Sequence, residues 1–203
     1  MKEFAVTIQG TADILFNAFE PVGDTPPSNK MTVAKDYSDE WLHKMYLLDD
    51  GTLYQPEAHL IGCLVKAAVT EKIPGRRGKT YKDAVKGGVF IEPACIPHKS
   101  TIKDFESAPV ITGPMPDSKS AVYVDRRPVR VQRAMVIRYR PALRKGWELS
   151  FTVQCLDDDF QPAALKAILD RAGREVGIGD FRPRFGRFMV TKFEPKECSH
   201  GKA

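Results

Sequence analysis

Residues 160–193, FQPAALKAILDRAGREVGIGDFRPRFGRFMVTKF, carry the pattern that decides the fold. In the first part Leu165, Ile168 and Leu169 recur at helical spacing, which predicts an amphipathic helix over 162–176. Gly177 stands where a glycine commonly ends a helix. The apolar residues of 188–193 then predict a strand. A helix, a glycine-rich loop and a strand are therefore expected to follow one another here.

The preceding residues predict the rest of a small sheet. Phe4, Val6 and Ile8 alternate with polar or small neighbours, as the residues of a half-buried strand do. Pro56 begins a second apolar stripe at helical spacing. The elements predicted before residue 160 are strands at 2–9, 89–92, 129–139 and 147–156, the last two as a hairpin, and a helix at 56–71.

The order of these elements indicates a fold class. Taken without the insertions, the order is strand, helix, strand, strand, helix, strand, which is the ferredoxin-like order found in RNA-recognition modules. We therefore predict an α+β fold with a four-stranded antiparallel sheet and both helices on one face, because each helix has one apolar stripe to bury. We expect a single domain over 1–203 with turn-rich insertions at about 20–52 and 93–120. The second insertion shows no sustained periodicity, which predicts a long loop or mobile flap.

The composition favours a polyanionic partner. Lys and Arg number 31 against 26 Asp and Glu, so the formal net charge is +5. The sequence has neither a signal-peptide pattern at its start nor an apolar run of the roughly 20 residues that span a membrane, which predicts a cytoplasmic protein without a membrane partner. The 4 cysteines are scattered and lack the Cys-x-x-Cys spacing of zinc sites. We therefore expect no metal, no cofactor and no disulfide framework.

The loop over 177–187 has the composition of a phosphate-binding segment. Glycines let backbone N–H groups approach a phosphate closely, and arginine guanidinium groups donate to it as a fork. Phenylalanine rings can stack on bases. The alternative is that the glycines cap a helix and shape a turn while the phenylalanines pack into the core. The nucleic-acid contacts predicted here are Gly177, Gly179, Phe181, Arg182, Arg184, Phe185, Gly186 and Arg187.

Two further segments are rich in positive charge. All charged residues of 126–145 are basic, and strand alternation over 129–140 is expected to place arginines on one sheet face and apolar side chains on the other. The alternative is a solvated face whose arginines pair with carboxylates elsewhere. A second basic segment, 74–79, lies in a loop. The binding residues predicted in these segments are Arg130, Arg133, Arg138, Tyr139, Arg140, Arg76, Arg77 and Lys79.

Two segments resemble motifs of one family. Residues 56–66, PEAHLIGCLVK, are similar to a Pro-led first helix with a central Gly, and residues 177–186 are similar to a glycine-rich loop before a last strand. Together they resemble the RAMP superfamily (repeat-associated mysterious proteins), which supplies guide-RNA-binding subunits of CRISPR effector complexes. The resemblance implies a ferredoxin-like fold, RNA or single-stranded DNA as partner, and assembly with further copies or other effector subunits. A stand-alone phage or mobile-element relative is equally compatible.

Three residues are candidates for catalysis: Asp24, His59 and His98. The histidines have no partner at the spacing of a catalytic dyad, and Asp24 is explained by a turn before prolines. Some RAMP subunits that cut RNA resemble this chain in having an aspartate in a flexible loop. We predict a non-enzymatic nucleic-acid-binding subunit. A RAMP-type endoribonuclease and a phage structural or assembly protein remain as alternatives.

Overall fold

Four antiparallel strands form the first sheet of the computed structural model, which describes residues 1–19, 40–112, 120–131, 134–156 and 160–196. Along β1 every second side chain is buried, and Phe4 pairs with Val153 on the neighbouring strand. The sheet therefore has one apolar face. Its strand order is β10 (Phe188–Lys196), β1 (Lys2–Gly10), β9 (Glu148–Cys155) and β4 (Val89–Glu92).

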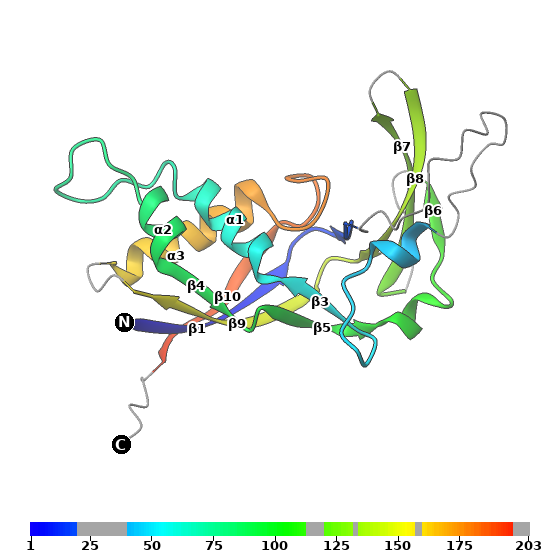
Figure 1. Ribbon diagram of the computed structural model, residues 1–203, viewed down its shortest axis with the longest axis horizontal. Helices are drawn as coiled ribbons and strands as arrows, with labels where there is room; N and C mark the ends of the chain where they lie inside the picture. The colour runs from blue at the N-terminus through cyan, green and yellow to red at the C-terminus, as the bar shows by residue number, and fades with distance from the viewer. Residues whose placement is uncertain (20–39, 113–119, 132–133, 157–159, 197–203) are drawn as a thin grey trace, which may run out of the picture.

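Three helices cover that apolar face (Figure 1): α1 (Glu57–Ala67), α2 (Lys82–Gly88) and α3 (Pro162–Arg171). The leucines of α1 and α3 that recur at helical spacing, such as Leu64 and Leu165, are fully buried against the sheet. α3 continues as a π-helical turn, Ala172–Val176. The predicted α+β class and antiparallel sheet are confirmed, with the two predicted long helices side by side on one face.

A second sheet lies at one end of the first (Figure 1). Its order is β2 (Ile14–Leu15), β8 (Ala134–Leu143), β7 (Val122–Val131) and β6 (Val110–Thr112). The hairpin predicted from 129–139 and 147–156 is wrong, because β7 pairs with β8 while β9 belongs to the first sheet. The residues between β7 and β8 include neither Gly nor Pro, so the sequence carries no turn signal there.

The predicted insertions contain regular structure. In the first, η1 (Glu40–Lys44) is a 3-10 helix. β3 (Thr52–Pro56) pairs with β5 (Cys95–Thr101), so the prediction of a long loop over 93–120 is wrong for this part, which also includes η2 (Ile102–Phe105) and β6. β5 contains a proline and little apolar alternation, so only its pairing with a distant strand makes it a strand. Residues 20–39 and 113–119 lie outside the described residues.

One apolar core extends under both sheets. It includes Phe4 and Ile8 of the first sheet and Val122 and Leu143 of the second. Trp147 packs so closely on Gly10 that a Cβ there would lie 2.2 Å from the indole ring. Among the described residues, no helix has both the length and the apolar character needed to cross a membrane.

Candidate nucleic-acid interface

The loop over residues 177–187, called the arginine loop below, is closed by its own backbone. The Ile178 N–H donates to the Gly186 carbonyl (2.9 Å), and the Gly186 N–H donates to the Asp13 carbonyl (2.7 Å). A Cβ at Gly186 would lie 1.6 Å from the Ile178 carbonyl oxygen, and the φ of +72° there also favours glycine. Gly177 likewise has a positive φ, of +75°. These glycines therefore serve the close contact between the two arms of the loop.

The arginine loop presents its arginine side chains to solvent. Arg182, Arg184 and Arg187 are exposed, whereas Ile178 of the same loop is fully buried. None of the ion pairs among the described residues involves these three arginines. The loop thus holds three guanidinium groups outward on a fixed backbone.

The two phenylalanines of the loop pack on an arginine of β7. Phe181 and Phe185 meet edge-on with ring centroids 6.2 Å apart, and the Arg127 guanidinium lies 4.7 Å from the Phe185 centroid and 5.3 Å from that of Phe181. The Arg127 guanidinium also donates two hydrogen bonds to the buried carboxylate of Asp125. Phe185 is half-buried beside Leu15, while Phe181 is 43% exposed. Of the two rings predicted to stack, Phe181 is therefore the more accessible to a base.

An ion pair joins the arginine loop to β8. Arg140 Nε lies 2.7 Å from Asp180 Oδ2, and the Asp180 N–H donates to the Leu15 carbonyl (2.9 Å). The Arg140 side chain is only 11% exposed. The sequence placed Arg140 on an open basic face, but the structure buries most of it between the loop and the second sheet.

Two small pockets open beside this ion pair and share Asn17. The larger, of about 250 Å³, gathers positive charge; the smaller, of about 90 Å³, lies against the base of the arginine loop. Asn17, Lys44, Arg138, Tyr139 and Arg140 line the larger pocket, and Leu15, Phe16, Asn17, Tyr46, His59, Gly179 and Asp180 line the smaller.

His59 belongs to the smaller pocket. Its imidazole hydrogen-bonds with the Gln55 side chain and meets the Tyr46 ring edge-on, with centroids 5.4 Å apart. Burial, and then the positive charge of Arg182, lower the pKa of His59 below its ordinary value. The ring is therefore neutral at pH 7 and can accept a proton, as a general base must.

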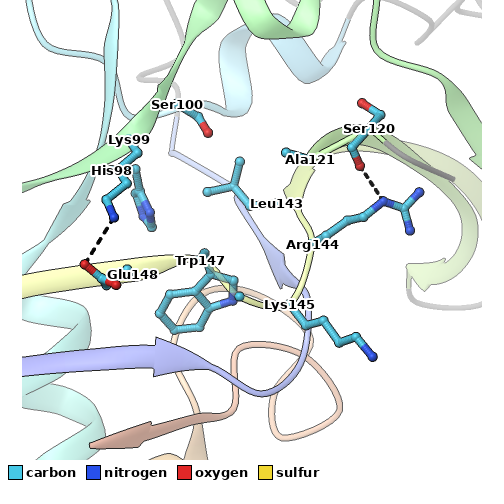
Figure 2. Close-up of a pocket in the computed structure, with 11 residues that line it drawn as sticks. His98, Lys99, Ser100, Ser120, Ala121, Leu143, Arg144, Lys145, Trp147 and Glu148 are labelled. Atoms are coloured by element: carbon cyan, nitrogen blue, oxygen red, sulfur yellow. Dashed lines mark hydrogen bonds and ion pairs between the residues drawn. The ribbon is translucent and has the colours of Figure 1, made fainter. Parts of the chain in front are cut away.

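His98 lies in a separate pocket of about 330 Å³ between β5 and the ends of β7 and β8 (Figure 2). Its ring packs edge-on against Phe16 and Trp147, and burial lowers its pKa to about 4. Neither ring nitrogen has a hydrogen-bond partner among the described residues. Around it, Lys99 pairs with Glu148 at 3.2 Å. The structure thus does not bring His98 together with the arginine loop.

The arginines of β7 and β8 lie on both faces of their sheet. Arg130 pairs with Met135 and shares its face, whereas Arg127 pairs with Arg138 on the opposite face. The prediction of a single basic face is therefore wrong. It treated 129–140 as one strand, but the chain turns between β7 and β8, so Arg130 of β7 and Arg138 of β8 lie on opposite faces of the sheet. Tyr139 accepts a hydrogen bond from Arg126 Nε at 3.1 Å.

The remaining predicted residues lie elsewhere. Arg76, Arg77 and Lys79 are exposed in the loop between α1 and α2, at the opposite end of the molecule from β7 and β8 (Figure 1). Arg133 and Asp24 lie outside the described residues. The structure therefore groups the arginine loop with Arg138 and Arg140, but not with the side chain of Tyr139, which lies on the other face of β8, or with the basic loop at 74–79.

Several residues at this interface were not predicted from the sequence. Arg127 had a signal, since it lies in the basic segment 126–145. Asn17, Lys44 and Tyr46 had none, because they enter the interface only through the packing of η1 and the chain after β2. Asp180 stood within the predicted loop but without an assigned role.

Comparisons with known proteins identify a shared fold. No protein-family model matches the chain, and no curated protein sequence matches it significantly. A chain of the Type III-B Cmr-beta bound to cognate target RNA has a TM-score of 0.53 and 11% identity over 96% of this chain and 60% of that chain. A chain of a Type IV-B CRISPR complex has a TM-score of 0.46 and 9% identity over 99% of this chain and 93% of that one. This chain thus spans about three fifths of the Cmr-beta chain, and the likeness shows a common fold.

Proposed function

We propose that this protein binds RNA or single-stranded DNA through the arginine loop and the adjoining part of β7 and β8. The observation that carries the proposal is the exposure of Arg182, Arg184 and Arg187 on a loop whose backbone is held by hydrogen bonds within the chain. Guanidinium groups in a fixed array match the phosphates of a strand, and each contact releases counterions. Phe181 adds an accessible ring for base stacking.

The fold supports a RAMP-like assignment. In chain order the first sheet and its long helices run β1, α1, β4, β9, α3, β10, and the sheet order is β10-β1-β9-β4. We propose that these elements form a ferredoxin-like unit within a single domain over 1–203. The solved chain of similar fold belongs to a complex bound to its target RNA. By analogy we propose a cytoplasmic subunit of a CRISPR-type ribonucleoprotein, or a phage-encoded relative, that assembles with copies of itself or other subunits.

Binding to defined strands tests the proposal. The full chain is titrated into labelled single-stranded RNA, single-stranded DNA and duplex DNA of one sequence, after nuclease treatment and removal of any co-purified nucleic acid. We expect one of the single strands to bind, with affinity that falls steeply as salt rises. Failure to bind either strand at low salt would overturn the proposal.

A second candidate function is cleavage of RNA. The observation that favours it is the neutral imidazole of His59, which lies beside Tyr46 in the pocket under Gly179 and near the charge of Arg182. A general base next to a held phosphate is the arrangement that metal-independent RNA cleavage needs. Incubation of labelled RNA with the protein in EDTA, compared with the His59→Ala variant, decides between cleavage and binding alone.

A further inference from the structure

The larger pocket of the interface has a strongly positive lining. Its volume is about 250 Å³, and it lies between the strand β8, the residue Lys44 of η1 and Asn17 after β2. Of the described residues that line it, Lys44, Arg138 and Arg140 are cationic and none is acidic. Arg140 is paired with the carboxylate of Asp180. The described residues that line the pocket therefore contribute positive charge to it.

Arg140 supplies the sharpest feature of the pocket. Its Nε is paired with Asp180, but its buried Nη1 has no hydrogen-bond partner among the described residues. A guanidinium has five N–H donors, and a buried donor without an acceptor is costly. An acceptor oxygen entering the pocket would remove that cost. The buried donor thus points to an anionic or strongly accepting ligand.

The neighbouring groups are suited to an oxyanion. The Lys44 main chain is held in place, since its carbonyl accepts the Ala18 N–H at 3.0 Å. Arg138 and Arg140 alternate along β8 and so share one face of the strand, whereas the Tyr139 side chain lies on the opposite face against Arg126. Asn17 adds an amide with two donors. Charged and neutral donors therefore converge from three separate parts of the chain.

We infer that this pocket binds one phosphate group of the nucleic-acid strand, an inference that rests on the proposed function. Its volume lies just below the roughly 300–1000 Å³ of pockets that enclose whole small molecules, so it suits a phosphate with part of its sugar. The phosphate comes either from a chain end or from an internal phosphodiester. A terminal phosphate carries about −1.5 to −2 charges at pH 7, against −1 for a phosphodiester, and so profits more from the cations.

Strands that differ only at their ends distinguish the two sources. We would measure the binding of internally labelled RNA carrying a 5′-hydroxyl, a 5′-phosphate or a 3′-phosphate to the full-length wild type and to the Lys44→Gln and Arg138→Gln variants. For a chain-end ligand, the wild type prefers one phosphorylated strand by about tenfold and the variants lose that preference. For an internal phosphodiester, the wild type shows no preference and each variant weakens all strands with a salt slope lower by about 0.7.

The Arg182→Ala, Arg184→Ala, Arg187→Ala triple variant separates the pocket from the arginine loop. It weakens every strand but retains any end preference, because the pocket is intact. If the Lys44 and Arg138 variants bind all strands as the wild type does, the pocket does not bind a phosphate of the strand, and the proposed function still stands.

Inorganic phosphate tests the pocket directly, even if no strand binds. The probe is the Arg140 Nε–Hε signal in ¹H–¹⁵N spectra, identified by its loss in the Arg140→Lys variant. We expect this signal to shift as phosphate is added at constant ionic strength, and to shift less in Lys44→Gln. No shift at millimolar phosphate would overturn the pocket as a phosphate site. A shift without strand binding would refute the proposed function and leave the pocket as a site for phosphate alone.

Discussion

Removing the three arginines of the loop together should weaken nucleic-acid binding about 100-fold at low salt. The change is Arg182→Ala, Arg184→Ala and Arg187→Ala, which deletes exposed side chains and leaves the backbone hydrogen bonds of Ile178 and Gly186 untouched. Each phosphate contact to a single strand adds about 0.7 to the slope of log affinity against log salt, so three contacts add about 2. If affinity at about 1 M salt is unchanged, a slope lower by 2 amounts to about 100-fold at about 0.1 M.

The assay is fluorescence anisotropy with labelled single-stranded RNA over a series of salt concentrations. The matched control removes three exposed lysines away from the loop, Lys103, Lys192 and Lys196. Lys192 takes part in an exposed ion pair of small energetic value, and Lys196 lies 3.9 Å from a carboxylate oxygen of Glu3. Circular dichroism and thermal unfolding should be the same for all three proteins. An equal loss of affinity in both triple variants would mean that attraction depends on overall charge, and the reasoning about the loop would be refuted.

Three further predictions concern stability and are checked by chemical or thermal unfolding. Gly186→Ala should destabilise the protein by at least about 2 kcal/mol, because the new Cβ would lie 1.6 Å from a backbone oxygen. Gly62→Ala, at a helical site with nothing within 4 Å of the new Cβ, should stabilise it by up to about 1 kcal/mol. Equal effects of the two substitutions would contradict this reasoning. His98 is buried with a pKa of about 4, below the unfolded value of 6.5, so the unfolded state binds a proton first as the pH falls. The free energy of unfolding should fall by up to about 3 kcal/mol as the pH is lowered from about 6.5 to 4. In the His98→Phe variant this fall should be smaller. Arg127→Ala should lower the free energy of unfolding by about 3 kcal/mol, because it leaves the carboxylate of Asp125 buried and unpaired. Adding Asp125→Asn should recover part of this loss. No recovery would show that Arg127 stabilises the protein through its contacts with the phenylalanines instead.

Local patterns in the sequence were enough to predict the strands of the first sheet and its two long helices. β1, α1, β4, α3 and β10 were all predicted near their observed positions, because each has its own period of burial and its own capping or turn residue. The outward direction of the loop arginines was also predictable, since a buried unpaired guanidinium is too costly to be the default. These features depend on residues close together in the chain.

Pairing between distant segments was decided only by the tertiary structure. β5 is a strand because β3 lies beside it, and β7 pairs with β8 although no Gly or Pro marks the turn between them. The same reason explains the phosphate pocket. Lys44, Arg138 and Asn17 converge on Arg140 only when η1 and the chain after β2 pack against β8, and the ion pair with Asp180 forms only when the arginine loop closes over the second sheet. Neither contact produces a local pattern in the sequence, because the residues involved are far apart in the chain and meet only after folding.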